Sequence, residues 1–304
     1  MKGSQLQTRG TVMKPLIKPP SLQGMLMLPT VVVLGVISML PFFYNIWIGL
    51  HDYYLLYPQD MTFIGLKNYL NIILDPSFWS ALGRTVYFSG IGVSLELALG
   101  MGIALLLSRD FPGKGVMLTL LLMPMVLTPI AAAYMWRIMY SPSLGIINYL
   151  LSFLHIRGLE WTADYNLAIP SLILVDVWQW TPFMALILSA GLMSMPTELF
   201  EAAVVDGATS WQCFRHLILP LLKGQIMVAL LIRLIDSLRT FDIIYAMTGA
   251  GPGHASETLN LYVYFTAFRD LDMGRASALG IVFLFIVIAV CTLLVSWSRI
   301  ELTD

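Results

Sequence analysis

The chain has 304 residues, of which 58% are apolar and only 12% are charged, and its mean hydropathy is +0.79. This composition lies well outside the range of soluble domains and indicates a polytopic membrane protein. The formal net charge of −1 and the absence of a long basic run argue against nucleic-acid binding. The two cysteines, Cys213 and Cys291, have neither disulfide nor metal-site spacing, so we expect both to be inert.

The chain is predicted to begin with a basic tail over residues 1–23, on the cytoplasmic side of a membrane. No small-residue cleavage site follows this tail, so it does not resemble a removed signal peptide. Residues 24–84 are predicted to hold a first transmembrane helix and an external loop, residues 85–298 the transmembrane core, and residues 299–304 a cytoplasmic C-terminus.

Six segments approach the roughly 20 apolar residues that a helix needs to cross the hydrocarbon core. They lie near residues 25–50, 85–108, 116–138, 168–193, 220–246 and 277–298. The sequence therefore predicts an all-α fold with six transmembrane helices and both ends on one side. Lys and Arg are denser in the tails, the 109–115 loop and the polar loop around residue 206 than in the opposite loops, which predicts cytoplasmic termini.

Six polar or charged residues fall inside these predicted spans, where an ionised group costs at least a few kcal/mol unless it is paired or faces water. They are Glu96, Asp176, Gln179, Arg233, Asp236 and Arg239. We expect Glu96, Arg233, Asp236 and Arg239 to form a buried charge network or gate, with neighbours paired along one helix.

The fourth span contains the stretch Asp176 to Pro182, in which Gln179 stands between two tryptophans. Sugars have apolar C–H faces and a rim of hydroxyls, so broad aromatic faces beside an amide suit a sugar pathway. The predicted pathway residues are Asp176, Trp178, Gln179, Trp180 and Asp236. A proline kink at Pro182 with tryptophans that only pack explains the same residues, and both interpretations stay open.

A polar island from Glu201 to Pro220 interrupts this apolar sequence. Thr197 is placed to cap a helix that runs through Glu201, and Gly207 is predicted to end that helix. Thr209 and Gln212 have the spacing of a capping box, which predicts a second short helix. The island is therefore predicted to fold as helix, glycine turn and helix, too polar to insert into a membrane, which suits docking of a soluble partner.

The island resembles the EAA motif of ATP-binding-cassette importer permeases. The matching residues are Glu201, Ala202, Ala203, Asp206, Gly207, Ala208, Ile218, Leu219 and Pro220. In that family the loop, here residues 195–219, is a coupling helix that sits in a cleft of an ATPase subunit. The resemblance implies ATPase-coupling roles for Glu201, Ala202, Ala203, Asp206, Gly207, Leu219 and Pro220, and a type I importer permease fold.

Two external segments are similar to the maltose-type carbohydrate branch of this family, one from Phe63 to Trp79 and one from Phe241 to Leu259. Within the second, the turn-rich strip Thr248–Gly253 cannot hold a regular helix. The segment Leu144–Ile156 has the spacing of a helix at a membrane interface. By this resemblance the partners are a second related permease, two copies of a cytoplasmic ATPase subunit and an external substrate-binding protein, in a prokaryotic inner membrane.

The chain itself is expected to be non-catalytic and to hold no cofactor and no metal. All four histidines lie in loops or at span ends, and the Pro112–Gly115 stretch lacks the spacing of a phosphate-binding loop, so ATP and Mg should bind to the partner ATPase. The predicted cargo is a disaccharide, oligosaccharide or polyol. Acidic residues near the pathway disfavour a phosphorylated cargo, although Arg233 and Arg239 weaken that argument.

Two other classes of protein compete with this interpretation. An ion-coupled secondary transporter would use the buried carboxylates of Glu96, Asp176 or Asp236, but it leaves the EAA loop unexplained. A membrane-embedded hydrolase is disfavoured, because no intramembrane histidine accompanies a candidate serine.

Overall fold

The structure of the chain is a computed structural model that describes residues 22–300, with side chains described for residues 27–296. The predicted basic tail lies outside the described residues except for residues 22 and 23, and residues 301–304 of the predicted C-terminus also lie outside them. The chain divides into two units between Trp47 and Ile48, and each unit is considered by itself.

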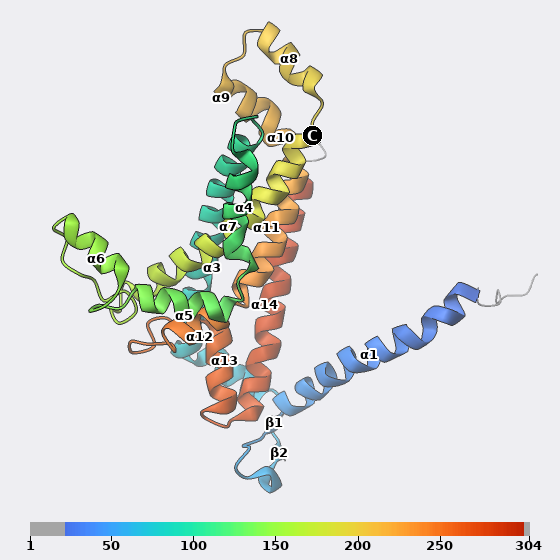
Figure 1. Ribbon diagram of the computed structural model, residues 1–304. Coiled ribbons are helices and arrows are strands. Elements are labelled where there is room, and N and C mark those ends of the chain that lie inside the picture. Colours follow the sequence, from blue (N-terminus) through green and yellow to red (C-terminus); the bar gives the residue numbers. More distant parts are fainter. Residues whose placement is uncertain (1–21, 301–304) are drawn as a thin grey trace, which may run out of the picture. The chain divides into compact units, whose positions relative to one another are not determined.

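The described residues are mostly helical (Figure 1). The helices are α1 (Leu22–Gly49), α2 (Lys67–Leu74), α3 (Pro76–Leu107), α4 (Lys114–Val126), α5 (Pro129–Met139), α6 (Ile146–Phe153), α7 (Ala168–Met193), α8 (Thr197–Val205), α9 (Ser210–Cys213), α10 (Leu219–Leu221), α11 (Lys223–Leu238), α12 (Asp242–Met247), α13 (Leu259–Phe268) and α14 (Met273–Ile300). The chain also forms a 3₁₀ turn, η1 (Pro58–Asp60), and a π-helical turn, η2 (Phe214–Ile218).

Within residues 22–300, four helices are long and apolar enough to cross a membrane, namely α1, α3, α7 and α14. Two bent helix pairs each pass the same test as a unit: α4 with α5, bent by 99°, and the Ser210–Leu221 segment with α11, bent by 66°. The described chain therefore holds four to six candidate spans. Helix α1, which makes up the described part of the first unit, is exposed and apolar along most of its length.

The third predicted span, near residues 116–138, is not one straight helix. Leu127 and Thr128 are extended, with ψ of 140° and 141°, and they separate α4 from α5. Proline at position 129 explains the break, because its ring removes one backbone donor and forces the preceding residue out of the helical region. The prediction of a continuous helix was wrong at this point.

The second and fifth spans differ from their predicted bounds. Helix α3 begins at Pro76, nine residues before the predicted start, because Asp75 caps it with a hydrogen bond from Ser77 N at 2.9 Å. Helix α11 ends at Leu238, well short of 246, and α12 follows after a short break. The Arg239 carbonyl, freed at this break, accepts a hydrogen bond from Asn260 Nδ2 at 2.7 Å.

Helices α3 and α7 pack closely side by side. At Gly100 an added Cβ would lie 2.6 Å from Met184 Cβ, a distance that real Cβ atoms essentially never show, so only glycine permits this approach. At Gly92, two turns earlier on α3, an added Cβ would lie 3.6 Å from Asp176 Oδ2 of α7, which is an ordinary contact distance. This close contact brings the polar residues of the two helices within reach of each other.

A polar cluster ties the loop before α3 to the C-terminal helices. Asp75 Oδ2 accepts hydrogen bonds from Tyr262 Oη, at 2.6 Å, and from Arg275, whose guanidinium also donates to Tyr262 Oη at 2.7 Å. Burial by itself would raise the pKa of the Asp75 carboxyl, but the hydrogen bonds from Tyr262 and Ser77 and the charge of Arg275 outweigh it and hold the pKa below its usual value.

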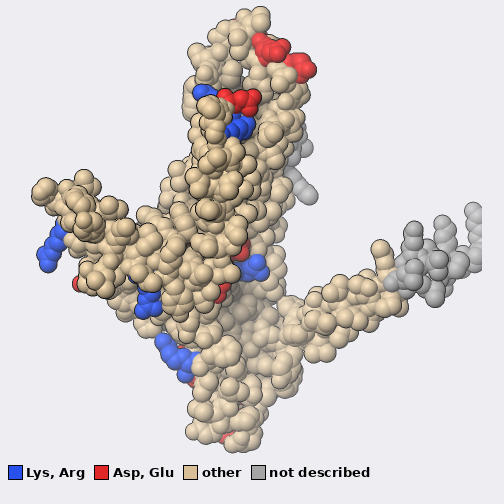
Figure 2. All heavy atoms as spheres, in the orientation of Figure 1, with Lys and Arg blue, Asp and Glu red and all other residues tan. Residues whose placement is uncertain are grey.

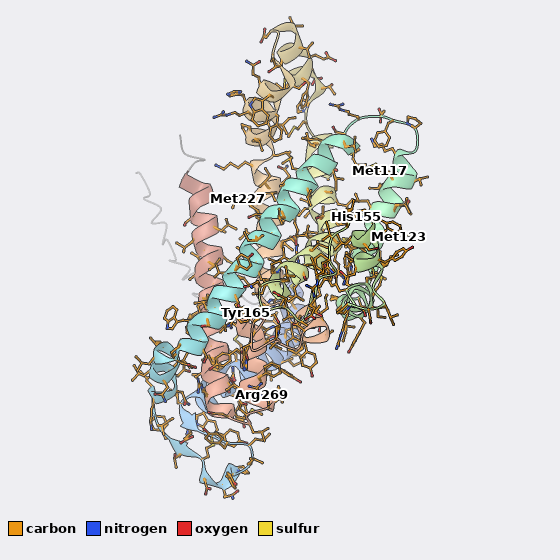
Figure 3. The ribbon with its side chains drawn as sticks, turned by 90° about the vertical axis from the view of Figure 1, so that its left-hand side faces the viewer. Met117, Met123, His155, Tyr165, Met227 and Arg269 are labelled. Carbon is orange, nitrogen blue, oxygen red and sulfur yellow. The ribbon has the colours of Figure 1, made fainter. Side chains whose placement is uncertain are left out.

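The loop between α1 and α2 forms a small hairpin in which β1 (His51–Asp52) pairs antiparallel with β2 (Thr62–Phe63). Asn68 holds it in place, because its Nδ2 donates to the carbonyls of Gly49, at 3.0 Å, and His51, at 2.9 Å. This hairpin and Arg269 lie toward the end of the second unit that is opposite α8 and α9 (Figure 3).

Two of the predicted loop features are confirmed. Helix α6 lies inside the segment Leu144–Ile156, and the Thr248–Gly253 strip holds no regular helix. Buried Asn148 anchors α6, since its Oδ1 accepts hydrogen bonds from Leu159 N and Trp161 Nε1. Tyr149, Leu150 and Phe153 remain exposed on the same helix.

Candidate functional site

The polar island folds as two short helices joined by a sharp turn. Helix α8 begins at Thr197, directly after Pro196, and no side chain caps it, so the predicted capping role of Thr197 was wrong. The helix ends in a Schellman motif: Gly207, at φ +75°, donates to the Val204 carbonyl at 3.0 Å, and Ala208 donates to the Ala203 carbonyl at 2.9 Å. This left-handed position explains why glycine stands there.

The second helix of the island, α9, begins with the predicted capping box. Thr209 Oγ1 accepts a hydrogen bond from Gln212 N at 3.3 Å, and Thr209 N donates to Gln212 Oε1 at 2.7 Å. The π-helical turn η2 continues α9 and leads into α10. The capping box is therefore confirmed, and together with Gly207 it sets the angle between α8 and α9.

The α8–α9 pair projects beyond the ends of the long helices of the second unit (Figure 1). Glu201, Ala202, Asp206 and Gly207 are exposed, while Ala203 is half-buried. Acidic side chains lie near the tip of this end, with basic side chains close below them (Figure 2).

The inner side of the island packs against the core of the long helices. Phe214, Ile218 and Leu219 pack against a buried cluster contributed by α3, α7 and the start of α11. The members of that cluster are Met101, Ala104, Leu188, Leu192 and Leu222. Pro220 is exposed at the start of α10. The inner side of the island is therefore in close-packed contact with α3 and α7.

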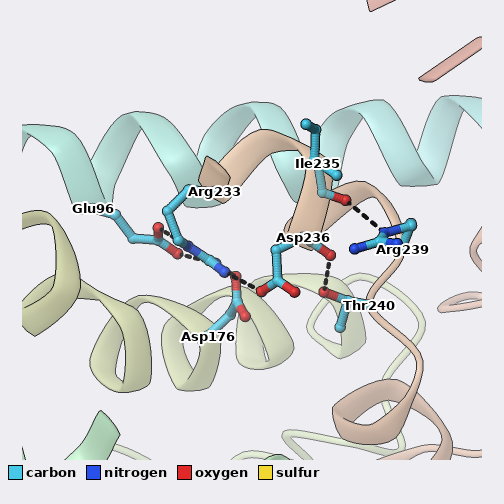
Figure 4. Close-up of polar contacts among 7 residues, drawn as sticks. All are labelled: Glu96, Asp176, Arg233, Ile235, Asp236, Arg239 and Thr240. Atoms are coloured by element: carbon cyan, nitrogen blue, oxygen red, sulfur yellow. Dashed lines mark hydrogen bonds and ion pairs between the residues drawn. The ribbon is translucent and has the colours of Figure 1, made fainter. Parts of the chain in front are cut away.

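A second site lies where α3, α7 and α11 meet, and its centre is the buried side chain of Arg233, which is 1% exposed (Figure 4). Arg233 donates two hydrogen bonds to Glu96, from Nε to Oε2 at 2.7 Å and from Nη2 to Oε1 at 2.8 Å. It also binds Asp176 Oδ2 at 3.0 Å and Asp236 Oδ2 at 2.6 Å. One guanidinium thus holds carboxylates from three helices, the geometry to which its planar fork of donors is suited.

The arrangement differs from the predicted network in two respects. Asp176, assigned to the substrate pathway from the sequence, binds Arg233 directly. Arg239 lies outside the cluster: it is exposed, and its Nε donates to the Ile235 carbonyl at 3.3 Å (Figure 4). Helix α11 ends at Leu238, which explains this position, because Arg239 no longer lies on the helix that carries Arg233 and Asp236.

The residues around Pro182 also separate from one another. Trp178 packs edge-on against Trp136, with ring centroids 5.4 Å apart, in an apolar core. Gln179 is fully buried, and its Nε2 donates to the Leu127 carbonyl at 3.0 Å, which satisfies a group freed by the break between α4 and α5. Helix α7 continues through Pro182. Packing thus accounts for Trp178 and Gln179.

Trp180 points the other way and lines two cavities, of about 130 and 360 Å³, together with Asp236 and Arg239. The Arg233 guanidinium lies 4.8 Å from the Trp180 ring centroid, a cation–π contact. Asp176 reaches the smaller cavity, where Asp242 and Phe241 also lie, and Phe183 lines the larger one. Sequence reasoning did not identify Asp242, Phe241 or Phe183. The first two come beside α7 only because the helix is broken at residues 239–241.

These cavities offer carboxylates, a guanidinium and aromatic faces, which are the groups that bind hydroxylated molecules. Among residues 22–300, no group of three or more His, Cys, Asp and Glu side chains is placed to hold a metal ion.

Residues 97–300 match the family model described as "binding-protein-dependent transport system inner membrane component". The chain is 40% identical over 257 residues to the trehalose/maltose transport system permease protein MalF of Thermococcus litoralis, covering 84% of this chain and 86% of that protein. It is 35% identical to the trehalose transport system permease protein SugA of Mycobacterium tuberculosis, covering 84% and 82%.

A chain in the crystal structure of a bacterial ABC transporter for import of the acidic polysaccharide alginate has the same fold. Its TM-score is 0.79 at 22% identity, with 91% of this chain and 95% of that chain covered. The family model spans the charge cluster and the α8–α9 island alike. The chain therefore belongs to the family of binding-protein-dependent transport system inner membrane components, the permease subunits of ABC importers.

Proposed function

We propose that this permease moves a sugar or sugar-like solute, such as a disaccharide, oligosaccharide or polyol, into the cytoplasm. The observation that carries the proposal is the Trp180 cavity pair, in which an aromatic face stands beside carboxylates and a guanidinium between α7 and α11. The relatives named for trehalose and maltose support the same class of solute. In this proposal Asp176, Trp180 and Asp236 contact the solute, while Trp178 and Gln179 hold the pathway in shape.

The proposed topology has six spans, with α4–α5 and the α10–α11 region each serving as one bent span and both termini in the cytoplasm. The α8–α9 island then also lies in the cytoplasm. Irregular backbone inside a membrane is tolerated where it lines a cavity, and the break between α11 and α12 lines the smaller cavity here. Residues 1–23 and 299–304 serve as cytoplasmic tails, residues 24–84 as the first helix and external loop, and residues 85–298 as the permease core.

The α8–α9 island is proposed as the coupling element for a separate ATPase subunit. Glu201 supplies an exposed charge, and Ala202 and Ala203 allow close approach. Gly207, with the neighbouring Asp206, sets the turn. Leu219 and Pro220 join the element to the helix core. ATP-driven closure of two ATPase subunits would draw two such elements together and shift the permease between outward-open and inward-open states.

The proposed assembly contains a second, related permease, two cytoplasmic ATPase subunits that bind ATP and Mg, and an external substrate-binding protein. The crystal structure of the alginate transporter in complex with its periplasmic protein supports the last of these partners. The prokaryotic inner membrane is the proposed location.

The proposal is tested by purifying the tagged chain from native membranes in mild detergent, with matched samples that carry Glu201→Ala with Gly207→Val. Wild-type chain should bring down a second permease and an ATPase, and the variant should lose the ATPase. Uptake of radiolabelled disaccharide into vesicles loaded with ATP should depend on that ATPase. Uptake that persists without ATP and collapses with an ion gradient would contradict the proposal and favour ion-coupled transport.

A further inference from the structure

The smaller cavity beside the charge cluster is rich in acidic groups. Asp176 from α7, Asp236 from α11 and Asp242 from α12 all line it, and Arg239 is the basic residue on its wall. Trp180 forms an aromatic side. With a volume of about 130 Å³ it holds several waters or part of a sugar ring.

One atom in this wall lacks a partner. Asp176 is 1% exposed, and while its Oδ2 accepts from Arg233, its Oδ1 has no hydrogen-bond partner. An unsatisfied buried acceptor destabilises the fold, and more so when it is charged. The neighbouring Asp236 and Asp242 side chains are also acceptors when ionised, so three of the groups that line this cavity accept hydrogen bonds.

The basic residues near the cavity do not offset its excess of carboxylates. Arg233 is 1% exposed, four of its five N–H donors bind carboxylates, and the Trp180 ring covers one of its faces, so most of its hydrogen-bonding capacity is already used inside the cluster. Arg239 is exposed, but Asp236 and Asp242 share the cavity wall with it.

Four carboxylates, from Glu96, Asp176, Asp236 and Asp242, face two guanidiniums, from Arg233 and Arg239, which leaves a formal charge of −2. Asp242 is exposed and the Asp236 side chain is half-exposed, so part of this excess lies at the open side of the cavity, and a cleft lined by one sign of charge focuses the field there.

We propose that this negative potential makes the pathway select carbohydrates that carry no acidic group. Neutral and amine-bearing sugars supply hydroxyl and amine donors for the carboxylates of this wall, whereas carboxylated, sulfonated and phosphorylated sugars meet uncompensated charge. Asp176, Asp236 and Asp242 are then specificity-determining residues. The inference rests on the proposed transport of carbohydrates through this cavity, but the potential itself is measurable without any sugar.

The first test measures the potential directly. In a Cys213→Ser, Cys291→Ser background, Thr240→Cys places one thiol on the cavity wall, and Ser152→Cys places a control thiol on the exposed surface of α6. The purified complex in nanodiscs is treated with cationic and anionic methanethiosulfonate reagents of similar size. After correction for the control thiol, the cationic reagent should react at least about tenfold faster at position 240.

Charge variants identify the source of that ratio. Asp242→Asn, which lies outside the Arg233 ion pairs, and Asp176→Asn should each lower the cationic preference, Arg239→Gln should raise it, and about 1 M salt should largely abolish it. A corrected ratio near one, or a ratio unchanged by either Asn variant, would overturn the proposal. Asp242→Asn keeps the test valid if Asp176→Asn fails to fold.

The second test addresses selection, with one binding protein used throughout so that any change belongs to the permease. Vesicle uptake of a neutral disaccharide and of its uronic-acid analogue is compared between wild type and Asp242→Asn. The ratio of acidic to neutral uptake should rise several-fold in the variant, and an unchanged ratio would refute selection. If the cationic reagent reacts much faster at position 240 but the vesicles take up no sugar, carbohydrate transport is refuted and the negative potential still stands.

Discussion

Replacing Gly207 by valine is expected to uncouple ATP hydrolysis from transport while leaving the chain inserted in the membrane. Gly207 has φ +75°, and no atom lies within 4 Å of the position that a Cβ would take, so the cost comes from the backbone rather than from a collision. A residue with a Cβ pays about 1–2 kcal/mol in the left-handed region, and a β-branched residue pays more. That cost lowers the population of the native turn by a factor of about 5–30.

The assay reconstitutes the purified complex in vesicles and measures sugar uptake and ATPase activity per folded complex. Gly207→Asn is the graded control, because asparagine tolerates the left-handed region and should retain most uptake. Gly65→Val is the positional control: Gly65 has φ +60° and open space around it, but it lies in the turn between β2 and α2. Wild-type uptake in Gly207→Val, or equal uncoupling by Gly65→Val, would refute the reasoning.

Three further predictions concern stability, measured as thermal unfolding of the protein in detergent. Arg233→Ala leaves buried carboxylates without their common partner and should cost about 3–5 kcal/mol. Gly100→Val forces a Cβ against Met184 and should cost about 1–3 kcal/mol by overpacking. Because the folded-state pKa of Asp75 lies below its ordinary value, the Asp75 carboxylate stabilises the fold above about pH 4, and this contribution is lost as the pH falls through the folded-state pKa. Asp75→Asn should therefore be less stable than wild type at pH 7, and the difference should shrink as the pH falls through the folded-state pKa of Asp75.

Matched controls separate these effects from general damage. Arg269→Ala removes an exposed arginine whose ion pair with Asp270 is solvated, so it should change stability by less than about 1 kcal/mol. Gly102→Val adds a side chain on the same helix as Gly100 but into open space. Equal losses of stability in these controls would contradict the assigned causes, as would an Asp75→Asn deficit that persists unchanged at low pH.

Much of the local structure could be predicted because it depends on neighbouring residues. The Thr209–Gln212 capping box, the turn at Gly207 and the irregular Thr248–Gly253 strip follow from side chains and glycines close in sequence. The errors arose where two local signals compete. Apolar length predicted a continuous third span, but Pro129 broke it, and Thr197 was taken as a cap although Pro196 occupies that position.

The pairing of polar residues could not be predicted in the same way. Glu96 and Arg233 are 137 positions apart, and nothing in the spacing along either helix shows which carboxylate the arginine takes. The small residues that let α3 approach α7 brought Asp176 into the cluster, and the break after Leu238 put Arg239 outside it.

The sequence by itself determined that the chain is an apolar helical membrane protein, and it placed the polar island to within a few residues, since composition and short-range motifs are local properties. Only the tertiary structure decided which buried charges meet, which tryptophan faces a cavity, and that Asp176 keeps one oxygen without a partner. Those outcomes depend on how three helices pack, and packing is settled by contacts between residues far apart in the chain.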